Sequence, residues 1–301
     1  NPDMDCLGAS VGMWATIKQL GKNCNIILEN DTNAIDFYLS KLKSSSKYDN
    51  MFINGEEAEK LINEKSLLII VDVHNKGYVQ NYELVEKIGR KIIIDHHRRS
   101  PDIIEGAILN YIEVYASSTS EMVTEIIQYM LKKPVISNLE AEGLLAGIVM
   151  DTKGFQFNSG VRTFDAASFL RSLGADTIAV KKMFADSLTD YLAIAETIKN
   201  AQVKNKLAIA VCPSSISSSV IVARAADELL NISEIDVCFV LCESNNHIII
   251  SGRSVGDINV QVILEEIGGG GHMNMAGAKL EVSMDEALEK LNESIKKHLN
   301  C

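Results

Sequence analysis

A short apolar run near residue 92 ends abruptly in polar and charged side chains. Ile92 to Ile94 are followed at once by Asp95-His96-His97-Arg98-Arg99. Consecutive β-branched residues are typical of a strand buried on both faces of a parallel sheet. Ligands of open α/β sheets bind beyond the carboxyl ends of such strands. The residues alone leave two interpretations open, a charged turn or one edge of a functional site.

Strand-like and helix-like patterns alternate along the first half of the chain. The apolar, strand-like runs cover residues 25–28, 52–53, 67–73 and 92–94. Helical periodicity precedes the first run, at residues 8–20, and separates it from the second, at residues 32–42. Such alternation predicts βαβ units. We therefore expect an α/β protein with a parallel sheet and flanking helices.

The chain is expected to form two domains, because 301 residues exceed the usual size of one core. We predict a parallel-sheet domain over residues 1–185 and a smaller mixed α/β domain over residues 206–301. The second domain is predicted to contain a hairpin with strands at 238–242 and 247–251. The connection over residues 186–205 is predicted to be a linker helix, since it contains neither proline nor glycine.

The composition argues against several classes of protein. A net charge of −11 disfavours binding to duplex nucleic acid, which requires a basic face. The apolar runs fall short of the ~20 residues that a membrane helix needs. The six cysteines lack zinc-type spacing and indicate reduced core residues of a cytosolic compartment. The sequence starts at Asn1 without a methionine, so we expect a fragment of a longer protein.

Carboxylates recur where other predicted elements begin or end. Asp3 and Asp5 are two residues apart, and on extended backbone both side chains would project to the same side. One apolar strand ends in Asp72-Val73-His74, and a predicted helix over 139–150 ends at Asp151. An acid at a helix C-terminus is unfavourable unless a positive charge compensates it. We therefore interpret these aspartates as candidate ligands.

The collected side chains favour hard divalent cations. Oxygen-rich sites with one imidazole suit Mn²⁺ or Mg²⁺. Two cations ~3.5–4 Å apart would use this many carboxylates and would activate a water for phosphoryl displacement. Asp72 is the natural bridge, and His97 would face the substrate to stabilise phosphoryl charge or move a proton. The candidate ligands are Asp3, Asp5, Asp72, His96 and Asp151, with His74, Asp95 and His97 close by.

A run of glycines follows the helix predicted at 259–267. Gly268 to Gly271 directly precede His272. Glycine at this density lets backbone N–H groups approach an anion closely. The alternative interpretation is a mobile hinge or loop. Arg253, at the end of a predicted strand, favours contact with a phosphate.

A capping box is predicted at the start of a helix near residue 118. Ser118 and Glu121 have the spacing of its two members, each of which accepts a hydrogen bond from the backbone of the other. This role is a sufficient structural reason for both residues, so we assign them little functional weight.

These motifs, in this order, resemble the DHH/DHHA1 phosphoesterase family over essentially the whole chain. Finer features resemble its GdpP-type cyclic di-AMP phosphodiesterase branch. The segments that carry the resemblance are Asn1 to Asp5, Val71 to His74, Asp95 to Arg99, Tyr115 to Thr119, Asp151 to Lys153, Arg162 to Ser168, Ile258 to Ile263 and Gly268 to His272.

The resemblance implies hydrolysis of cyclic di-AMP to linear pApA with two Mn²⁺, or with Mg²⁺. One cation would take Asp3 and Asp72, the other Asp5, Asp72, His96 and Asp151. A further metal-binding His would lie two residues before Asn1. The catalytic residues would be His97 and Asp95. The residues that hold the nucleotide, across a cleft between the domains, would be Arg98, Arg253, Gly269, Gly270, Gly271 and His272.

The same resemblance implies a longer protein with transmembrane helices, a PAS-like domain and a degenerate GGDEF domain before this region. This part would lie at the cytoplasmic face of the cell membrane without touching it, and a homodimer is a further expectation. The alternatives that stay open are a nanoRNase or pApA phosphatase of the same family and a nucleotide-binding sensor without catalysis. An inorganic pyrophosphatase fits less well, since Arg253 and the glycine run suit a nucleotide.

Overall fold

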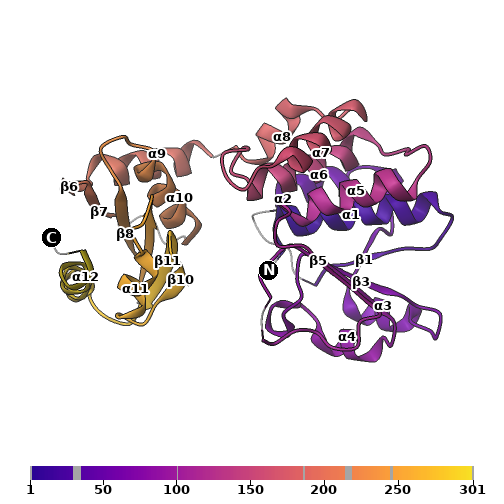
Figure 1. Ribbon diagram of the computed structural model, residues 1–301, viewed down its shortest axis with the longest axis horizontal. Coiled ribbons are helices and arrows are strands. Elements are labelled where there is room, and N and C mark those ends of the chain that lie inside the picture. The colour runs from indigo at the N-terminus through magenta and orange to yellow at the C-terminus, as the bar shows by residue number, and fades with distance from the viewer. Residues whose placement is uncertain are drawn as a thin grey trace. The chain divides into compact units, whose positions relative to one another are not determined.

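The computed structural model describes residues 2–29, 35–99, 101–185, 187–213, 219–244 and 247–299. Asn1 and Asp186, which the predictions include, lie outside the described residues. The chain divides into two compact units, residues 1–185 and residues 186–301 (Figure 1). Among the described helices, none combines the length and the apolar character needed to cross a membrane.

A parallel three-stranded sheet forms the centre of the first unit. Its strands lie in the order β3-β4-β5, and Val71 at the end of β3 lies opposite Ile94 of β4. A separate parallel pair is formed by β1 and β2. The strands are β1 (Ile26–Ile27), β2 (Phe52–Ile53), β3 (Leu68–Val71), β4 (Lys91–Asp95) and β5 (Leu109–Ile112). The predicted parallel sheet is confirmed.

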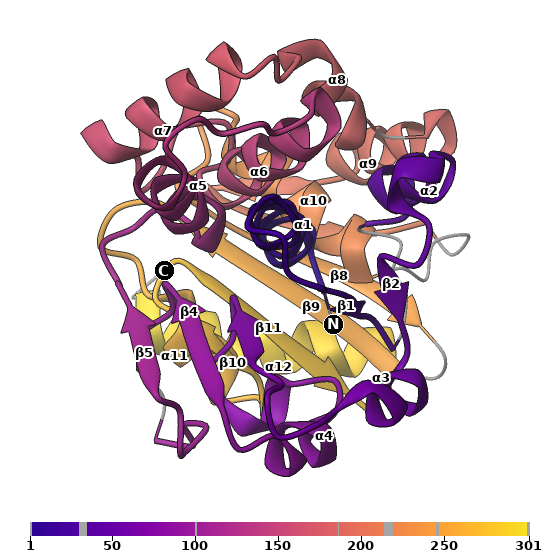
Figure 2. The same cartoon turned by 90° about the vertical axis from the view of Figure 1, so that its right-hand side faces the viewer.

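Helices lie on both sides of this sheet. They are α1 (Met4–Gln19), α2 (Asp36–Lys43), α3 (Gly55–Leu61), α4 (Tyr82–Lys87), α5 (Thr119–Met130), α6 (Asn138–Asp151), α7 (Val161–Ser172) and α8 (Thr177–Met183). Figures 1 and 2 show α1, α5 and α6 on one side and α4 on the other. Ile94 belongs to the core on the α1 side, and Ile93 packs with Val85 of α4. The predicted burial of both faces of this strand is confirmed.

The prediction of extended backbone at both Asp3 and Asp5 is wrong for Asp5, which is helical, whereas Asp3 is extended. Helix α1 begins at Met4, and Asp3 is its N-cap, whose Oδ1 accepts hydrogen bonds from the backbone N–H groups of Asp5 (3.1 Å) and Cys6 (3.0 Å). An aspartate cap followed by an acid in the first turn is a helix start. The two-residue spacing therefore reflects capping and not a strand.

The second unit contains a mixed six-stranded sheet with the order β10-β11-β9-β8-β7-β6. Only the β7–β8 pair is parallel among the described ladders. Its strands are β6 (Gln202–Lys204), β7 (Leu207–Val211), β8 (Val237–Ser244), β9 (His247–Ser254), β10 (Gly270–His272) and β11 (Met275–Leu280). The antiparallel β8–β9 pair corresponds to the predicted hairpin. The mixed α/β prediction for this half is confirmed.

Two layers of helix cover this second sheet. The helices are α9 (Leu188–Lys199), α10 (Ser219–Leu230), α11 (Val260–Glu265) and α12 (Met284–Leu299). Ile194 of α9 shares a core with α10 and with Cys238 of β8, and Phe239 of β8 faces the core formed with α11 and α12. The stretch predicted as a linker helix thus holds α9 and β6, which both pack within the second unit.

The glycine run is not simply a loop. Gly270 to His272 form β10, an edge strand of the sheet, with Gly270 opposite Gly277 and His272 opposite Met275 of β11. Glycine is needed there because a Cβ on Gly271 would lie 2.5 Å from the Met275 carbonyl oxygen. Close approach of two backbones therefore explains part of this run, which sequence reasoning attributed to an anion loop or a hinge.

Candidate metal centre

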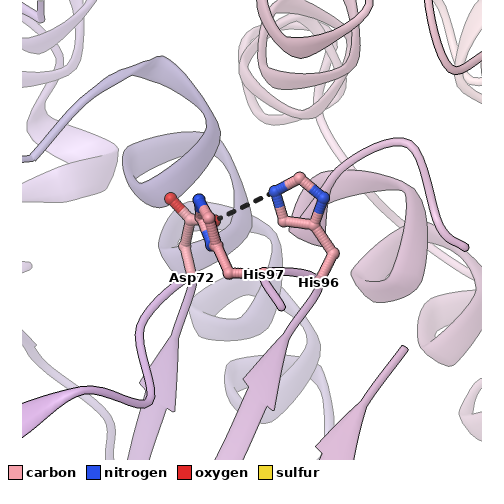
Figure 3. Close-up of side chains that lie close together, drawn as sticks. All are labelled: Asp72, His96 and His97. Carbon is pink, nitrogen blue, oxygen red and sulfur yellow. Dashed lines mark ion pairs between the residues drawn. The ribbon is translucent and has the colours of Figure 1, made fainter. Parts of the chain in front are cut away.

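Four elements of the first unit bring their polar ends together. Asp72 follows β3 and His96 follows β4, so both leave the carboxyl edge of the sheet. Asp5 lies in the first turn of α1, and Asp151 is the last residue of α6, as predicted. Figure 3 shows Asp72, His96 and His97 meeting at the ends of neighbouring strands. The strand-end rule for α/β sheets therefore describes this site.

The Nε2 atom of His96 is the centre of the cluster. It lies 3.0 Å from Asp151 Oδ2, 3.7 Å from Asp72 Oδ1 and 4.0 Å from Asp5 Oδ2. This atom is buried, yet it has no hydrogen-bond partner of acceptable geometry among the described residues. On the other side of the ring, Nδ1 donates to the Ala116 carbonyl oxygen (3.4 Å). A ring held in this way directs Nε2 at the carboxylates, as metal-binding histidines do.

The side chains that meet here match the donor set of a divalent cation. Two groups have ligand atoms within 4.8 Å of one another, Asp5 with His96 and Asp151, and Asp72 with His96 and His97. Carboxylate oxygens with one imidazole nitrogen suit Mn²⁺ or Mg²⁺. The residues therefore fit such a cation, and the unpartnered His96 Nε2 is the observation that tests this fit.

Burial and mutual repulsion raise the pKa values of two carboxylates in this cluster, Asp72 and Asp151. Burial and the nearby carboxylates of Asp5 and Asp3 raise the pKa of Asp72 well above its usual value. Burial likewise raises the pKa of Asp151 to about 6. Burial lowers the pKa of His96, but the Asp151 carboxylate outweighs it and brings the pKa to about 9. Carboxylates this close disfavour one another unless a cation compensates them.

The backbone of Asp72 is strained in a way that suits a functional site. Its φ angle is +63°, in the left-handed region that non-glycine residues rarely adopt. The strand ladder nevertheless continues, because the Asp72 N–H donates to the Ile94 carbonyl oxygen (2.9 Å). Backbone strain of this kind persists where the surrounding structure holds it, commonly at functional sites.

Asp95 belongs to a separate hydrogen-bond network. Its Oδ1 accepts from the backbone N–H (3.1 Å) and from Nδ1 (2.8 Å) of His97, and its Oδ2 accepts from Nδ1 of His74. Burial opposes ionisation, but the bonds from His97 and His74 outweigh it and lower the pKa of Asp95 below its usual value. Asp95 and His74 are buried, whereas the His97 side chain is 57% exposed. Asp95 therefore orients His97.

Sequence reasoning missed the residues at the start of α5. The backbone N–H groups of Thr119 and Ser120 donate to Asp5 at 2.7 Å and 2.8 Å, and the Thr119 hydroxyl donates to Asp72 at 3.0 Å. Ser118 does cap α5 as predicted, but the Glu121 carboxylate accepts from Ser117. The capping box is thus only half present. The capping pattern at residues 118–121 predicts only local hydrogen bonds, so it does not predict the contacts of Thr119 and Ser120 with Asp5 and Asp72.

The predicted nucleotide-binding residues lie in both units. Arg98, in the first, is exposed. Arg253, in β9, is buried: its Nε donates to Asp227 of α10 (2.7 Å) and its Nη1 to Ser251 Oγ (3.1 Å). His272 is exposed on β10. A pocket of about 480 Å³ in the second unit is lined by Ser219, Ile249, Ile250, Ser251, Gly268, Gly269, Gly270, Gly277, Ala278 and Lys279.

The fold and this cluster define an α/β protein with a candidate divalent-cation centre at the carboxyl edge of a parallel sheet. The chain matches the DHH family, N-terminal domain, over residues 1–148, and the DHHA1 domain over residues 204–299. A solved structure of an exopolyphosphatase-related protein from Bacteroides fragilis superposes with a TM-score of 0.82 at 25% identity, covering 98% of this chain and 89% of that one.

The chain is also similar in sequence to curated proteins. The chain is 39% identical to the cyclic-di-AMP phosphodiesterase GdpP of Bacillus subtilis, over 98% of this chain and 46% of that protein. It is 29% identical to the bifunctional oligoribonuclease and PAP phosphatase NrnA of Mycoplasma genitalium, over 92% of this chain and 85% of that protein. The chain belongs to the DHH family and carries a DHHA1 domain, as its motifs predict. It spans about half the length of the first of these relatives.

Proposed function

We propose that this chain is the catalytic part of a divalent-cation-dependent phosphodiesterase that hydrolyses cyclic di-AMP to linear pApA. The observation that carries the proposal is His96 Nε2, which lies within 4.0 Å of three carboxylates and has no hydrogen-bond partner among the described residues. The choice of substrate is supported by the 39% identity to a cyclic-di-AMP phosphodiesterase over nearly the whole chain.

Two Mn²⁺ are the proposed cofactors, with Mg²⁺ as the alternative. Asp3 and Asp72 would hold one cation, and Asp5, Asp72, His96 and Asp151 would hold the other, with Asp72 shared. When bound, such cations supply Lewis-acid stabilisation of phosphoryl charge and activate a water nucleophile. The support for this donor set is its chemistry, oxygen ligands with one imidazole.

Asp95 and His97 are the proposed catalytic pair. Asp95 Oδ1 accepts hydrogen bonds from both the backbone N–H and Nδ1 of His97. This leaves Nε2 as the ring nitrogen that can contact the substrate. From there it can donate to a phosphoryl oxygen or transfer a proton to the leaving oxygen. His74 holds the second oxygen of Asp95 and keeps the carboxylate from turning. The exposure of His97 makes it accessible to a bound phosphodiester.

The nucleotide is proposed to bind through Arg98 of the first unit and through the second unit. The residues proposed for the second unit are Arg253, Gly269, Gly270, Gly271 and His272. Support comes from the glycine-lined pocket, which also carries Lys279 and Ser251. Glycines without side chains let a ligand approach the backbone closely, and Lys279 adds positive charge in an otherwise acidic protein.

The decisive experiment is the product profile from cyclic di-AMP with Mn²⁺, resolved by chromatography into pApA and AMP. We expect pApA to accumulate and EDTA to stop the reaction. Asp72→Asn should abolish turnover, while Glu59→Gln, which alters an exposed carboxylate paired with Lys87, should not. An untouched cyclic substrate together with rapid cleavage of pApA would reject the proposal.

That outcome would favour the second candidate, an oligoribonuclease or pApA phosphatase. The 29% identity to NrnA extends over 85% of that protein, which makes this alternative specific. Relative rates on cyclic di-AMP, pApA and a longer RNA separate the two activities. Calorimetric binding of cyclic di-AMP without any turnover would instead indicate a sensor.

We also propose that the chain works as the cytoplasmic part of a membrane-anchored protein and forms a homodimer. The support for a longer protein is the 46% coverage of the first relative. Fractionation of the product of the complete gene tests the anchoring. Light scattering of the present chain tests the dimer, and a monomer mass over a wide concentration range would exclude it.

A further inference from the structure

Thr119 contacts two candidate ligands that come from different elements. Its backbone N–H donates to Asp5 Oδ2 (2.7 Å), and its hydroxyl donates to Asp72 Oδ1 (3.0 Å). Asp5 lies on α1 and Asp72 follows β3, so Thr119, the first residue of α5, joins three elements. Its side chain is fully buried. Thr119 ends the segment from Tyr115 that carries part of the family resemblance, but that resemblance gives it no role.

The oxygens that Thr119 contacts are those that face the imidazole. Asp5 Oδ2 lies 4.0 Å and Asp72 Oδ1 lies 3.7 Å from His96 Nε2. A carboxylate oxygen has two lone-pair directions. A donor that occupies one of them fixes the direction of the other, which remains for a cation. Thr119 therefore donates to the same carboxylate oxygens, Asp5 Oδ2 and Asp72 Oδ1, that would coordinate the cation.

Asp72 depends on this contact more than Asp5 does. The two oxygens of Asp5 accept from the N–H groups of Thr119 and Ser120, which fix its carboxylate twice. Among the described residues, the Thr119 hydroxyl is the only hydrogen-bond donor to the Asp72 side chain. Asp72 also stands on strained, left-handed backbone, at φ +63°. Without the hydroxyl, its carboxylate would lose the contact that fixes its orientation.

The hydroxyl of Thr119 has no evident role in building the helix. Ser118 is the N-cap of α5, and its side chain accepts from the Glu121 N–H at 3.0 Å. The contact of Thr119 with Asp5 uses its backbone, which any residue but proline retains. Substituting the side chain therefore removes the Asp72 contact and leaves the cap and the Asp5 contact in place.

We propose that Thr119 is a positioning residue that turns the Asp72 carboxylate toward the same cation as Asp5. This inference rests on the proposed metal centre. Residues that hydrogen-bond to metal ligands commonly contribute ten- to hundredfold to metal affinity. Thr119→Val, which keeps the shape and removes the hydroxyl, is expected to weaken Mn²⁺ binding by roughly that factor. Thr119→Ser, which restores the hydroxyl, should return affinity to within a few-fold of wild type.

The test is calorimetric titration of the chain with Mn²⁺, which needs no substrate. Thr124→Val is the matched control, because Thr124 is equally buried on α5 and its hydroxyl donates to the Ser120 carbonyl oxygen (2.7 Å), not to a carboxylate. We expect the control to bind Mn²⁺ like wild type. Melting curves of all variants in EDTA separate loss of fold from loss of affinity.

The calorimetric results can overturn the positioning role of Thr119 in several ways. A wild-type affinity for Thr119→Val, or an equal loss in Thr124→Val, overturns the positioning role while the metal centre stands. Failure of Thr119→Ser to restore binding overturns it as well, and this comparison holds even if the valine variant does not fold. A wild-type chain that binds no Mn²⁺ refutes the metal centre itself, and the inference falls with it.

Discussion

Substituting Gly147 by alanine is expected to push Asp5 out of place. Gly147 lies on α6 directly against the start of α1. A Cβ at this position would meet Ser120 Oγ at 2.2 Å, Asp5 Oδ1 at 2.7 Å and Asp5 Cα at 2.9 Å. The serine hydroxyl can rotate away. The Cα belongs to the backbone of a buried helix, so α1 and α6 would have to separate.

Two free-energy terms oppose each other in this variant. Alanine in place of glycine inside a helix stabilises by about 0.5–1 kcal/mol. Overpacking of a filled core costs about 1–3 kcal/mol. Because the overlap involves backbone, we expect the second term to win, with a net loss of about 1–2 kcal/mol in the free energy of unfolding. A unit of this size would then melt about 2–4 °C lower for each kcal/mol.

Trp14 provides the assay. It is the only tryptophan of the chain and lies buried in α1, so its fluorescence follows unfolding of the first unit. Melting is recorded in EDTA, and Mn²⁺ affinity is measured by calorimetry. Gly89→Ala is the control, because a Cβ there meets no atom within 4 Å. The reasoning is refuted if Gly147→Ala melts no lower than wild type and binds Mn²⁺ equally well.

The remaining predictions concern the cation, the catalytic pair and a buried thiol. Mn²⁺ at a hundred times its dissociation constant should stabilise the first unit by about 2.7 kcal/mol, seen as a higher Trp14 melting temperature that EDTA reverses; no shift would count against the metal centre. Asp95→Asn should lower turnover of cyclic di-AMP by roughly 10²- to 10⁴-fold with near-normal Mn²⁺ affinity in calorimetry, because Asp95 holds His97; a parallel loss of affinity would contradict that separation. Burial raises the pKa of the Cys238 thiol to about 12, so thiol reagents at about pH 8 should leave it unlabelled in the native protein, as peptide mass spectrometry can check; rapid labelling would show that it is accessible.

Local sequence patterns correctly predicted the strand and the helix that carry Asp95 and Asp151. The isoleucines before Asp95 form a strand buried on both faces, and the apolar helix before Asp151 ends at that residue. Both predictions rest on periodicity and burial, which neighbouring residues determine. The parallel arrangement of β3 and β4 then followed from the alternation of elements.

Short polar segments were less predictable. The spacing of Asp3 and Asp5 suits a strand or a helix cap equally; in the structure Asp3 caps α1, and Asp5 accepts hydrogen bonds from the start of α5. Gly270 and Gly271, after α11, form an edge strand with His272 because β11 pairs with them. The partners of Asp5 on α5 and of Gly270 on β11 are not sequence neighbours, so local patterns do not predict these contacts.

The sequence by itself determined which side chains stand at the ends of elements, because periodicity and capping act over a few residues. Only the tertiary structure decided which of these side chains contact one another. His96 faces three carboxylates, while Asp95 lies between His74 and His97. Thr119 reaches Asp5 and Asp72, 114 and 47 residues away along the chain. Side-chain directions of this kind depend on long-range packing and hydrogen bonds, which exist only once the chain has folded.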